Sequence, residues 1–215
     1  MLQPIELPRR LNEFDVPAET RLGITTARRR IEAFQDCWRQ HKIEQFVAAD
    51  YELVFQTLAW IRDTRPLIGN RFVEWGCGFA VVASLATRLG FDSFGIEAEP
   101  DLLRPGRETL ADWFETPGDG PELIGGNFLP PGSERLADDP TLPSLGHGVP
   151  CAYQVLGLDL DDFALVYSYP WPGENEFHED VFDAHAAVGA VHVQFIGPNE
   201  MRAWRKVGRA SAGTR

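Results

Sequence analysis

The sequence has no uninterrupted apolar run of about 18 residues, and no signal-peptide pattern follows Met1. Its three cysteines, Cys37, Cys77 and Cys151, lie far apart, with no CxxC motif and no His-rich cluster near them. These absences speak against a membrane-spanning segment, a secreted protein, a disulfide framework and a metal site. We therefore expect a protein of the reducing cytoplasm.

Basic side chains are scarce in the body of the chain. Between Gln45 and Met201 there are 25 acidic and 7 basic residues, and the net charge of the whole chain is −12. An acidic body repels the phosphates of nucleic acids, so we expect no DNA or RNA partner and consider basic proteins, amines and neutral metabolites. The acidity can also serve solubility alone or reflect an acidic proteome. The 215 residues, 44% hydrophobic and 24% charged, suit one globular domain.

One stretch, from Arg71 to Pro100, has the pattern of a strand, a glycine turn, a helix and a second strand. The first apolar run meets Glu74 and then the glycine pair Gly76 and Gly78. Apolar residues at helical spacing follow, and the second strand finishes on Glu97. The stretch therefore predicts a βαβ unit.

The unit predicts where a ligand would bind. Glycines let the chain turn sharply beside a helix N-terminus, and Glu97, 21 residues beyond Gly76, suits ribose hydroxyls. A dinucleotide site needs a third glycine, but Val81 occupies that position. The carboxylate of Glu74 would also lie beside the pyrophosphate of a dinucleotide and repel it. A nicotinamide-dependent oxidoreductase is therefore disfavoured. A carboxylate there suits an ammonium group, which S-adenosylmethionine carries together with a ribose and no phosphate. A βαβ unit without a ligand is the alternative.

The stretch resembles the class I (Rossmann-like) S-adenosylmethionine-dependent methyltransferases of compact type. Their first motif, acid-x-Gly-x-Gly, is matched by Glu74, Gly76 and Gly78, and their second motif by Glu97; Ala80 stands where a third glycine often follows. The resemblance implies that this loop, with Cys77, lies along the methionine part of the cofactor and that Glu97 binds both ribose hydroxyls.

The same resemblance extends the cofactor site to three further positions. Gly126, Asn127 and Phe128 stand where the family has Gly-Asp-x, which implies that the Asn127 carbonyl oxygen binds the adenine amino group, beside Phe128. Phe46 and Tyr51, in the turn before the helix that precedes the first strand, are candidates to wall the site. Core or capping roles are the alternative for these two aromatic residues.

Residues 163–169 are expected to form the fourth strand. The turn that follows is rich in aromatic residues and prolines, from Tyr169 through Pro170 and Trp171 to Glu174. The resemblance places the methyl acceptor there, although Ser168 and Tyr169 replace the amide of the family's Asn-Pro-Pro-aromatic motif. An aromatic wall with a carboxylate favours a nitrogen nucleophile. We expect Tyr169 and Glu174 to be catalytic, and Tyr169, Pro170 and Trp171 to bind the substrate.

The acceptor itself is open at this point. An amine or a protein lysine is the first expectation, and an oxygen acceptor on a small metabolite is the second. A turn with a purely structural role would instead favour a catalytically silent binding module that keeps the fold, with or without the cofactor.

These features predict an α/β, Rossmann-like methyltransferase fold with a mostly parallel sheet in the order 3-2-1-4-5, a reduced edge and flanking helices. We expect residues 1–45 to form an N-terminal arm (1–23) and a helical extension (25–42). Residues 46–207 would form the cofactor-binding domain, and residues 208–215 a disordered tail.

Overall fold

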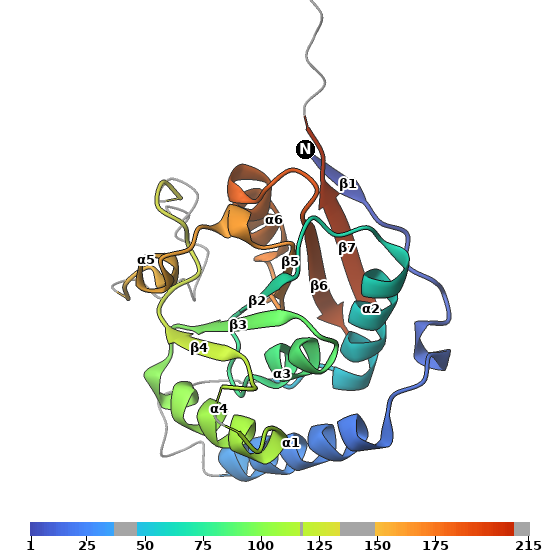
Figure 1. Ribbon diagram of the computed structural model, residues 1–215, viewed down its shortest axis with the longest axis vertical. Coiled ribbons are helices and arrows are strands. Elements are labelled where there is room, and N and C mark those ends of the chain that lie inside the picture. Colours follow the sequence, from blue (N-terminus) through green and yellow to red (C-terminus); the bar gives the residue numbers. More distant parts are fainter. Residues whose placement is uncertain (37–46, 117, 134–148, 209–215) are drawn as a thin grey trace, which may run out of the picture.

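The computed structural model describes residues 1–36, 47–116, 118–133 and 149–208. These residues form a seven-stranded sheet in the order β1-β7-β6-β5-β2-β3-β4 (Figure 1). The strands from β4 to β6 are parallel, and β7 is antiparallel to β6. The fold class is thereby confirmed. The predicted order 3-2-1-4-5 is confirmed as well, since the predicted strands 1 to 5 are β2 to β6, which lie in the order β4-β3-β2-β5-β6. The strands are β1 (Leu2–Pro4), β2 (Arg71–Trp75), β3 (Asp92–Glu97), β4 (Glu122–Gly125), β5 (Leu165–Ser168), β6 (Val191–Gly197) and β7 (Glu200–Lys206).

The reduced edge is where the structure differs from the expectation. β1 pairs antiparallel with β7, with Leu2 opposite Lys206 and Pro4 opposite Trp204, so part of the expected N-terminal arm fills the edge of the sheet. Three residues ending at a proline carry no alternation that identifies a strand. A proline is tolerated there because an edge strand has a side without ladder hydrogen bonds.

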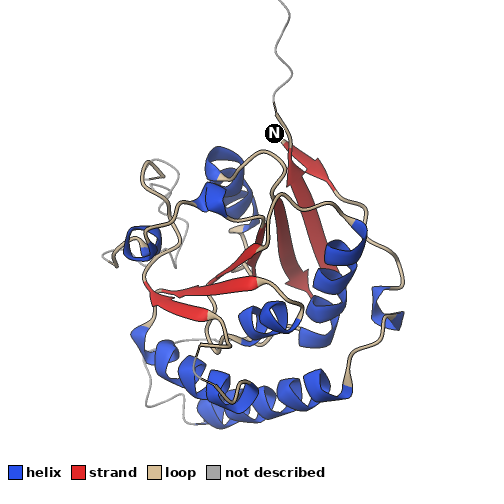
Figure 2. Cartoon of the chain, viewed as in Figure 1, coloured by secondary structure: helices blue, strands red, loops and turns tan. Residues whose placement is uncertain are grey.

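Helices cover both faces of the sheet (Figures 1 and 2). One core contains buried residues of α1 to α4 with Phe72, Leu165 and Tyr167 of the sheet, and the other contains residues of α5 and α6 with Val73 and Val166. Neighbouring residues of one strand therefore serve opposite cores, as the pleat requires. The helices are α1 (Ala18–Asp36), α2 (Tyr51–Thr64), α3 (Val81–Arg88), α4 (Pro100–Trp113), α5 (Ala152–Leu156) and α6 (Asn175–His185), with 3-10 turns at η1 (Leu11–Glu13) and η3 (Leu160–Asp162).

Helix α1 begins at Ala18, seven residues before the expected start at residue 25. The carbonyl of Pro17 accepts from the N–H of Arg21, so Pro17 stands at the start of the helix and not within an extended arm. Arg30 projects from α1 to Glu108 and Asp112 of α4, which joins the two helices that lie side by side in Figure 2. The expected end of this helix lies outside the described residues, as does the boundary expected at residue 45.

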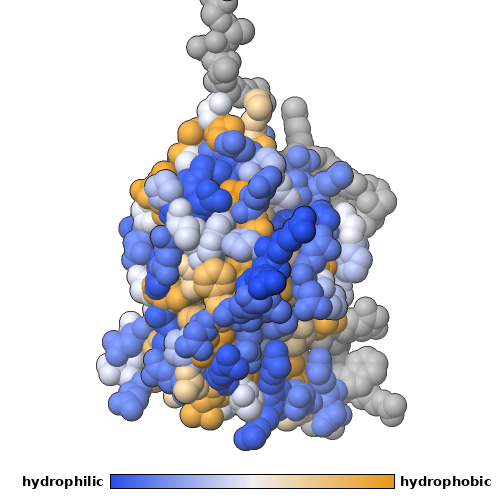
Figure 3. All heavy atoms as spheres, turned by 90° about the vertical axis from the view of Figure 1, so that its right-hand side faces the viewer, coloured by the Kyte–Doolittle hydropathy of each residue, from blue (hydrophilic) through white to orange (hydrophobic). Residues whose placement is uncertain are grey.

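Asp50 caps α2 by accepting from the N–H of Leu53 at 3.3 Å. The prolines of the segment 130–157 predict an irregular loop, but its described part contains α5. Hydrophilic side chains cover most of the face shown in Figure 3. Within the described ranges, no helix is long and apolar enough to span a membrane, and no group of three His, Cys, Asp or Glu side chains could hold a metal.

Candidate functional site

The loop between β2 and α3 has an unusual backbone. Gly76, Gly78 and Ala80 all have positive φ, at 68°, 49° and 57°, so every second residue lies in the left-handed region. Glycine enters this region freely, whereas an alanine there is sterically unfavourable. Ala80 therefore adopts, at some cost, the conformation that the family's third glycine would adopt easily.

Glu97 and Gly78 meet directly. One carboxylate oxygen of Glu97 accepts from the N–H of Gly78 at 2.7 Å, and the other accepts from the N–H of Glu99 at 2.9 Å. The Glu97 side chain is 6% exposed, and this burial raises its pKa. The carboxylate thus fixes the glycine loop against the end of β3, at the edge where ligands bind in parallel sheets.

Glu74 is turned toward the start of α3. Its side chain is 5% exposed and accepts from the N–H of Ala83 at 2.7 Å. Burial raises the pKa of this carboxyl, the bond from Ala83 opposes that shift, and the charge of Glu97 adds to it. One oxygen of Glu74 therefore satisfies an otherwise unpaired N–H of the helix. Its expected contact with an ammonium group stays a prediction.

Tyrosines gather around Glu74. Tyr167 lies opposite Glu74 on the neighbouring strand, and Tyr51 is the first residue of α2. Burial raises the pKa of both phenols, and the nearby charge of Glu74 raises it further. Tyr51 thus lies near the motif acid, and its expected role as a wall of the site stays a prediction. Phe46, its predicted companion, lies outside the described residues.

Asn127 holds the chain segment that returns after residue 148. Its Nδ2 donates to the carbonyl of Val149, and its Oδ1 accepts from the N–H of Leu129 at 3.0 Å. Its backbone forms a parallel bridge with Cys151. Both ends of the amide therefore have partners within the protein, and an adenine amino group would need the second lone pair of Oδ1.

Phe128 belongs to an aromatic stack. Its ring lies 4.7 Å from that of Trp75, nearly parallel at 12°, and 4.9 Å from that of His178. Trp75 also donates from Nε1 to the hydroxyl of Tyr153 at 2.8 Å. Phe128 thus contributes to the core beneath α6, and its expected contact with the cofactor stays a prediction.

The turn after β5 separates the two residues expected to be catalytic. Tyr169 packs edge-on against Phe195, with ring centroids 4.8 Å apart, and joins the core that includes α2. Glu174 is 2% exposed and lies 4.0 Å from Nε2 of His178, under α6. Trp171, 37% exposed, projects from the turn between them. Tyr169 and Glu174 therefore pack against different neighbours, and their expected catalytic roles stay predictions.

A buried polar cluster under α6 was missed at the level of sequence. Oγ of Ser168 lies 3.0 Å from Nε2 of His192, and burial lowers the pKa of His192 and brings that of His178 to about 3. Both imidazoles are therefore neutral at pH 7, and the approach of His178 to Glu174 is not an ion pair. Among the described residues, Nδ1 of each histidine and Oε1 of Gln194 have no hydrogen-bond partner. Ser168 lies on β5, and His192 and Gln194 occupy alternate positions of β6. That these three side chains meet depends on the pairing of the two strands.

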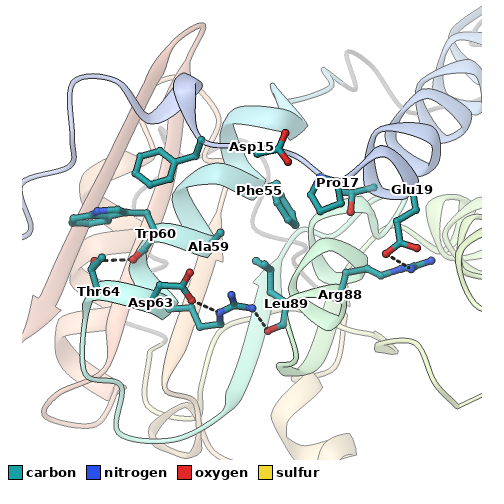
Figure 4. Close-up of a pocket in the computed structure, with 13 residues that line it drawn as sticks. Asp15, Pro17, Glu19, Phe55, Ala59, Trp60, Asp63, Thr64, Arg88 and Leu89 are labelled. Carbon is teal, nitrogen blue, oxygen red and sulfur yellow. Dashed lines mark hydrogen bonds and ion pairs between the residues drawn. The ribbon is translucent and has the colours of Figure 1, made fainter.

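A cavity of about 370 Å³ lies away from the glycine loop, between residues 14–20, the second half of α2 and the end of α3 (Figure 4). Phe14, Phe55 and Trp60 line it together with charged residues. Arg62 donates to the carbonyl of Leu89 at 2.6 Å, and Arg88 lies 3.4 Å from Glu19. Because the N-terminus of α3 faces the loop and the cavity adjoins its other end, this cavity is not the predicted cofactor site.

No family model and no curated protein matches the chain. The crystal structure of a methyltransferase from Geobacter sulfurreducens matches with a TM-score of 0.51 and 11% identity, over 83% of this chain and 88% of that one. An RNA methyltransferase from Salinibacter ruber, in complex with S-adenosyl-L-homocysteine, matches with a TM-score of 0.49 and 14% identity, over 74% and 92%. SAH-bound methyltransferase PaMTH1 from Podospora anserina gives 0.49 and 16%, over 86% and 65%.

At such identities the likeness concerns the fold, and of these three structures the one from Geobacter sulfurreducens has a TM-score above 0.5. The strand order and this match together show that the chain has the Rossmann-like methyltransferase fold.

Proposed function

We propose that the protein is an S-adenosylmethionine-dependent methyltransferase. The observation that carries the proposal is the contact between Glu97 and Gly78, because it joins the two predicted motifs at the carboxyl edge of β2 and β3. The fold shared with a methyltransferase supports it. S-adenosylmethionine, when bound, supplies an activated methyl group, so the protein has to position the acceptor, exclude water and accept a proton.

The loop fits such a cofactor in shape. A Cβ added at Gly76 would meet no atom within 4 Å, so space is open beside the first glycine. On its other side the loop is tightly packed, since a Cβ added at Gly106 of α4 would lie 2.9 Å from the carbonyl oxygen of Gly78. Each oxygen of Glu97 keeps a second lone pair for a ribose hydroxyl. The residues present therefore suit an adenosyl group.

The acceptor proposal is an amine or a protein lysine, and it depends on Tyr169 and Trp171. The exposed face of Trp171 can attract a cationic amine. Burial raises the pKa of Tyr169, so its hydroxyl stays protonated and orients the amine rather than removing its proton. Glu174 is buried beside His178 and would act on the acceptor only through its charge or after the turn moves. That nucleic acids are not substrates remains a prediction from the net charge.

A catalytically silent binding module is the second candidate. The intramolecular bonds of Glu74, Glu97 and Asn127 favour it, because each of these polar groups is already paired without a ligand. Such a module would keep the fold, with or without the cofactor, and transfer no methyl group.

Isothermal titration with S-adenosylhomocysteine, S-adenosylmethionine and NAD, joined to a turnover assay with methyl-labelled cofactor, separates the candidates. The enzyme binds the first two compounds and labels an acceptor in a panel of amines, proteins and hydroxylated metabolites. Binding without label supports the silent module, and binding of NAD alone would overturn the proposal. Label in a hydroxylated metabolite, with Tyr169→Ala and Glu174→Ala at full rate, would remove the amine acceptor.

A further inference from the structure

The hydroxyl of Tyr167 is buried, and no contact within the described fold explains why it is there. Its side chain is 1% exposed, and its Oη has no hydrogen-bond partner among the described residues. Burying a hydroxyl without a partner is unfavourable, and such groups often mark the place of an absent ligand or water. A phenylalanine would fill the same space without that penalty.

The surroundings of this hydroxyl are polar and belong to the cofactor edge of the sheet. Tyr167 pairs with Glu74 across β5 and β2, two residues before Gly76. The residues that interact electrostatically with Tyr167 are Glu74, Tyr51 and Tyr169. Helices α2 and α3 both begin here, so the positive ends of two helix dipoles point into this region.

The charges indicate which chemical group fits. The two phenols are held protonated by burial and by Glu74, so each can donate a hydrogen bond. The charge of Arg28 of α1 acts on Tyr51 by lowering its pKa, and the guanidinium lies 3.9 Å from Asp50. Donors, helix N-termini and a guanidinium suit a carboxylate, whereas Glu74 suits an ammonium group. A ligand that carries both within a few ångströms is an α-amino acid.

We propose that Tyr167 is a binding residue for the amino-acid end of the cofactor: its hydroxyl and that of Tyr51 donate to the carboxylate, and Glu74 accepts from the ammonium group. The inference deepens the proposed function and depends on it. It assigns to β5 a direct part in holding the cofactor, in addition to carrying the substrate turn at its end.

The test compares two ligands on one variant. Tyr167→Phe removes only the oxygen atom. We expect the affinity for S-adenosylhomocysteine to fall roughly tenfold or more, as the loss of a hydrogen bond to a charged group implies. The affinity for 5′-methylthioadenosine, which has the same adenosine and thioether but no amino-acid end, stays unchanged. Thermal stability stays the same or rises.

Tyr153→Phe is the matched control, because Tyr153 is equally buried but its hydroxyl is bonded to Trp75 on the opposite face of the sheet. This variant should lose stability and keep its affinity for both ligands. If Tyr167→Phe does not fold, Tyr51→Phe tests the same carboxylate contact and should show the same split between the two ligands.

The outcomes distinguish the two proposals. If the wild-type protein binds neither ligand, the proposed function itself is wrong. If it binds both and Tyr167→Phe changes neither affinity, the hydroxyl holds at most a buried water and the inference is wrong. An equal loss for both ligands would also overturn it, because the effect would then not concern the amino-acid end.

Discussion

Glu97 and Gly78, 19 residues apart in the chain, are joined by a hydrogen bond of 2.7 Å between a buried carboxylate and a backbone N–H. The bond closes the βαβ unit at the edge where the cofactor is proposed to bind. Glu97 therefore has two roles, because it holds the conformation of the glycine loop and is also proposed to bind the ligand.

The first prediction concerns this contact. Glu97→Ala should weaken binding of S-adenosylhomocysteine by about 1.5 to 3 kcal/mol, the usual contribution of a charged hydrogen-bond partner. Gly78→Val should abolish binding, because valine is strained at φ 49° and would place methyl groups against the ligand. Titration calorimetry measures both effects. Glu99→Ala, at an exposed acid two residues further on, is the control. Unchanged binding in both site variants would remove the site assignment.

Ala80→Gly should stabilise the protein. Glycine removes the left-handed strain of alanine, which stabilises the folded state by about 1–2 kcal/mol. The greater freedom of glycine in the unfolded chain offsets roughly 0.5–1 kcal/mol of this stabilisation. The expected net gain is about 0.5–1 kcal/mol, measured as the shift of the urea midpoint at constant slope. Ala86→Gly, inside α3, should instead destabilise by about 1 kcal/mol or more. A loss of stability in Ala80→Gly would show that Ala80 is not strained.

Acid should destabilise the fold through His178. Burial holds its pKa near 3 in the folded protein, against about 6.5 when unfolded, so the unfolded state binds the proton first. Stability is therefore lost as pH falls through the range between these values, by about 2 kcal/mol between pH 7 and pH 5. Urea unfolding at both pH values measures this loss.

The loss of stability between pH 7 and pH 5 is compared between wild type and His178→Phe. The difference between the two losses gives the contribution of this histidine, because the carboxylates contribute equally to both proteins. The variant should lose roughly 2 kcal/mol less on acidification. Parallel pH profiles of the two proteins would mean that His178 is not buried as a neutral group.

Asn127→Asp restores the acid of the family motif and should nevertheless destabilise the protein. The amide Nδ2 donates to the carbonyl of Val149, and a carboxylate would oppose that oxygen without a proton between them. A cost of about 1–3 kcal/mol is expected at pH 7. Thermal unfolding measures it, and Asn127→Ala should lose less because it leaves no repelling charge. An Asp variant as stable as the wild type would show that the bond to Val149 is dispensable.

The sequence predicted the parallel part of the sheet well, because the glycine loop, the acids and the apolar runs are local signals that each identify one element. It did not predict β1, whose three residues have no pattern of their own and become a strand only by pairing with β7. The start of α1 was misplaced because residues 1–23, with their prolines and without apolar periodicity, were assigned to an extended arm, whereas the helix begins directly after Pro17.

Some contacts of the candidate site could likewise be predicted from the sequence, and others could not. That Glu97 and Gly78 would be neighbours follows from the βαβ pattern. The bond from Asn127 to Val149 and the buried position of Tyr167 do not, because each depends on segments that only the folded chain brings together.

Edge pairing by β1 has a consequence for how the chain reaches its native state. Residues 2–4 are synthesised long before their partners, residues 204–206. Closing so long a loop costs entropy that only the finished sheet offsets, and non-local strand pairs of this kind form slowly. Until β7 has been synthesised, β1 has no strand to join, and the edge of the nascent sheet stays open to pairing with other chains.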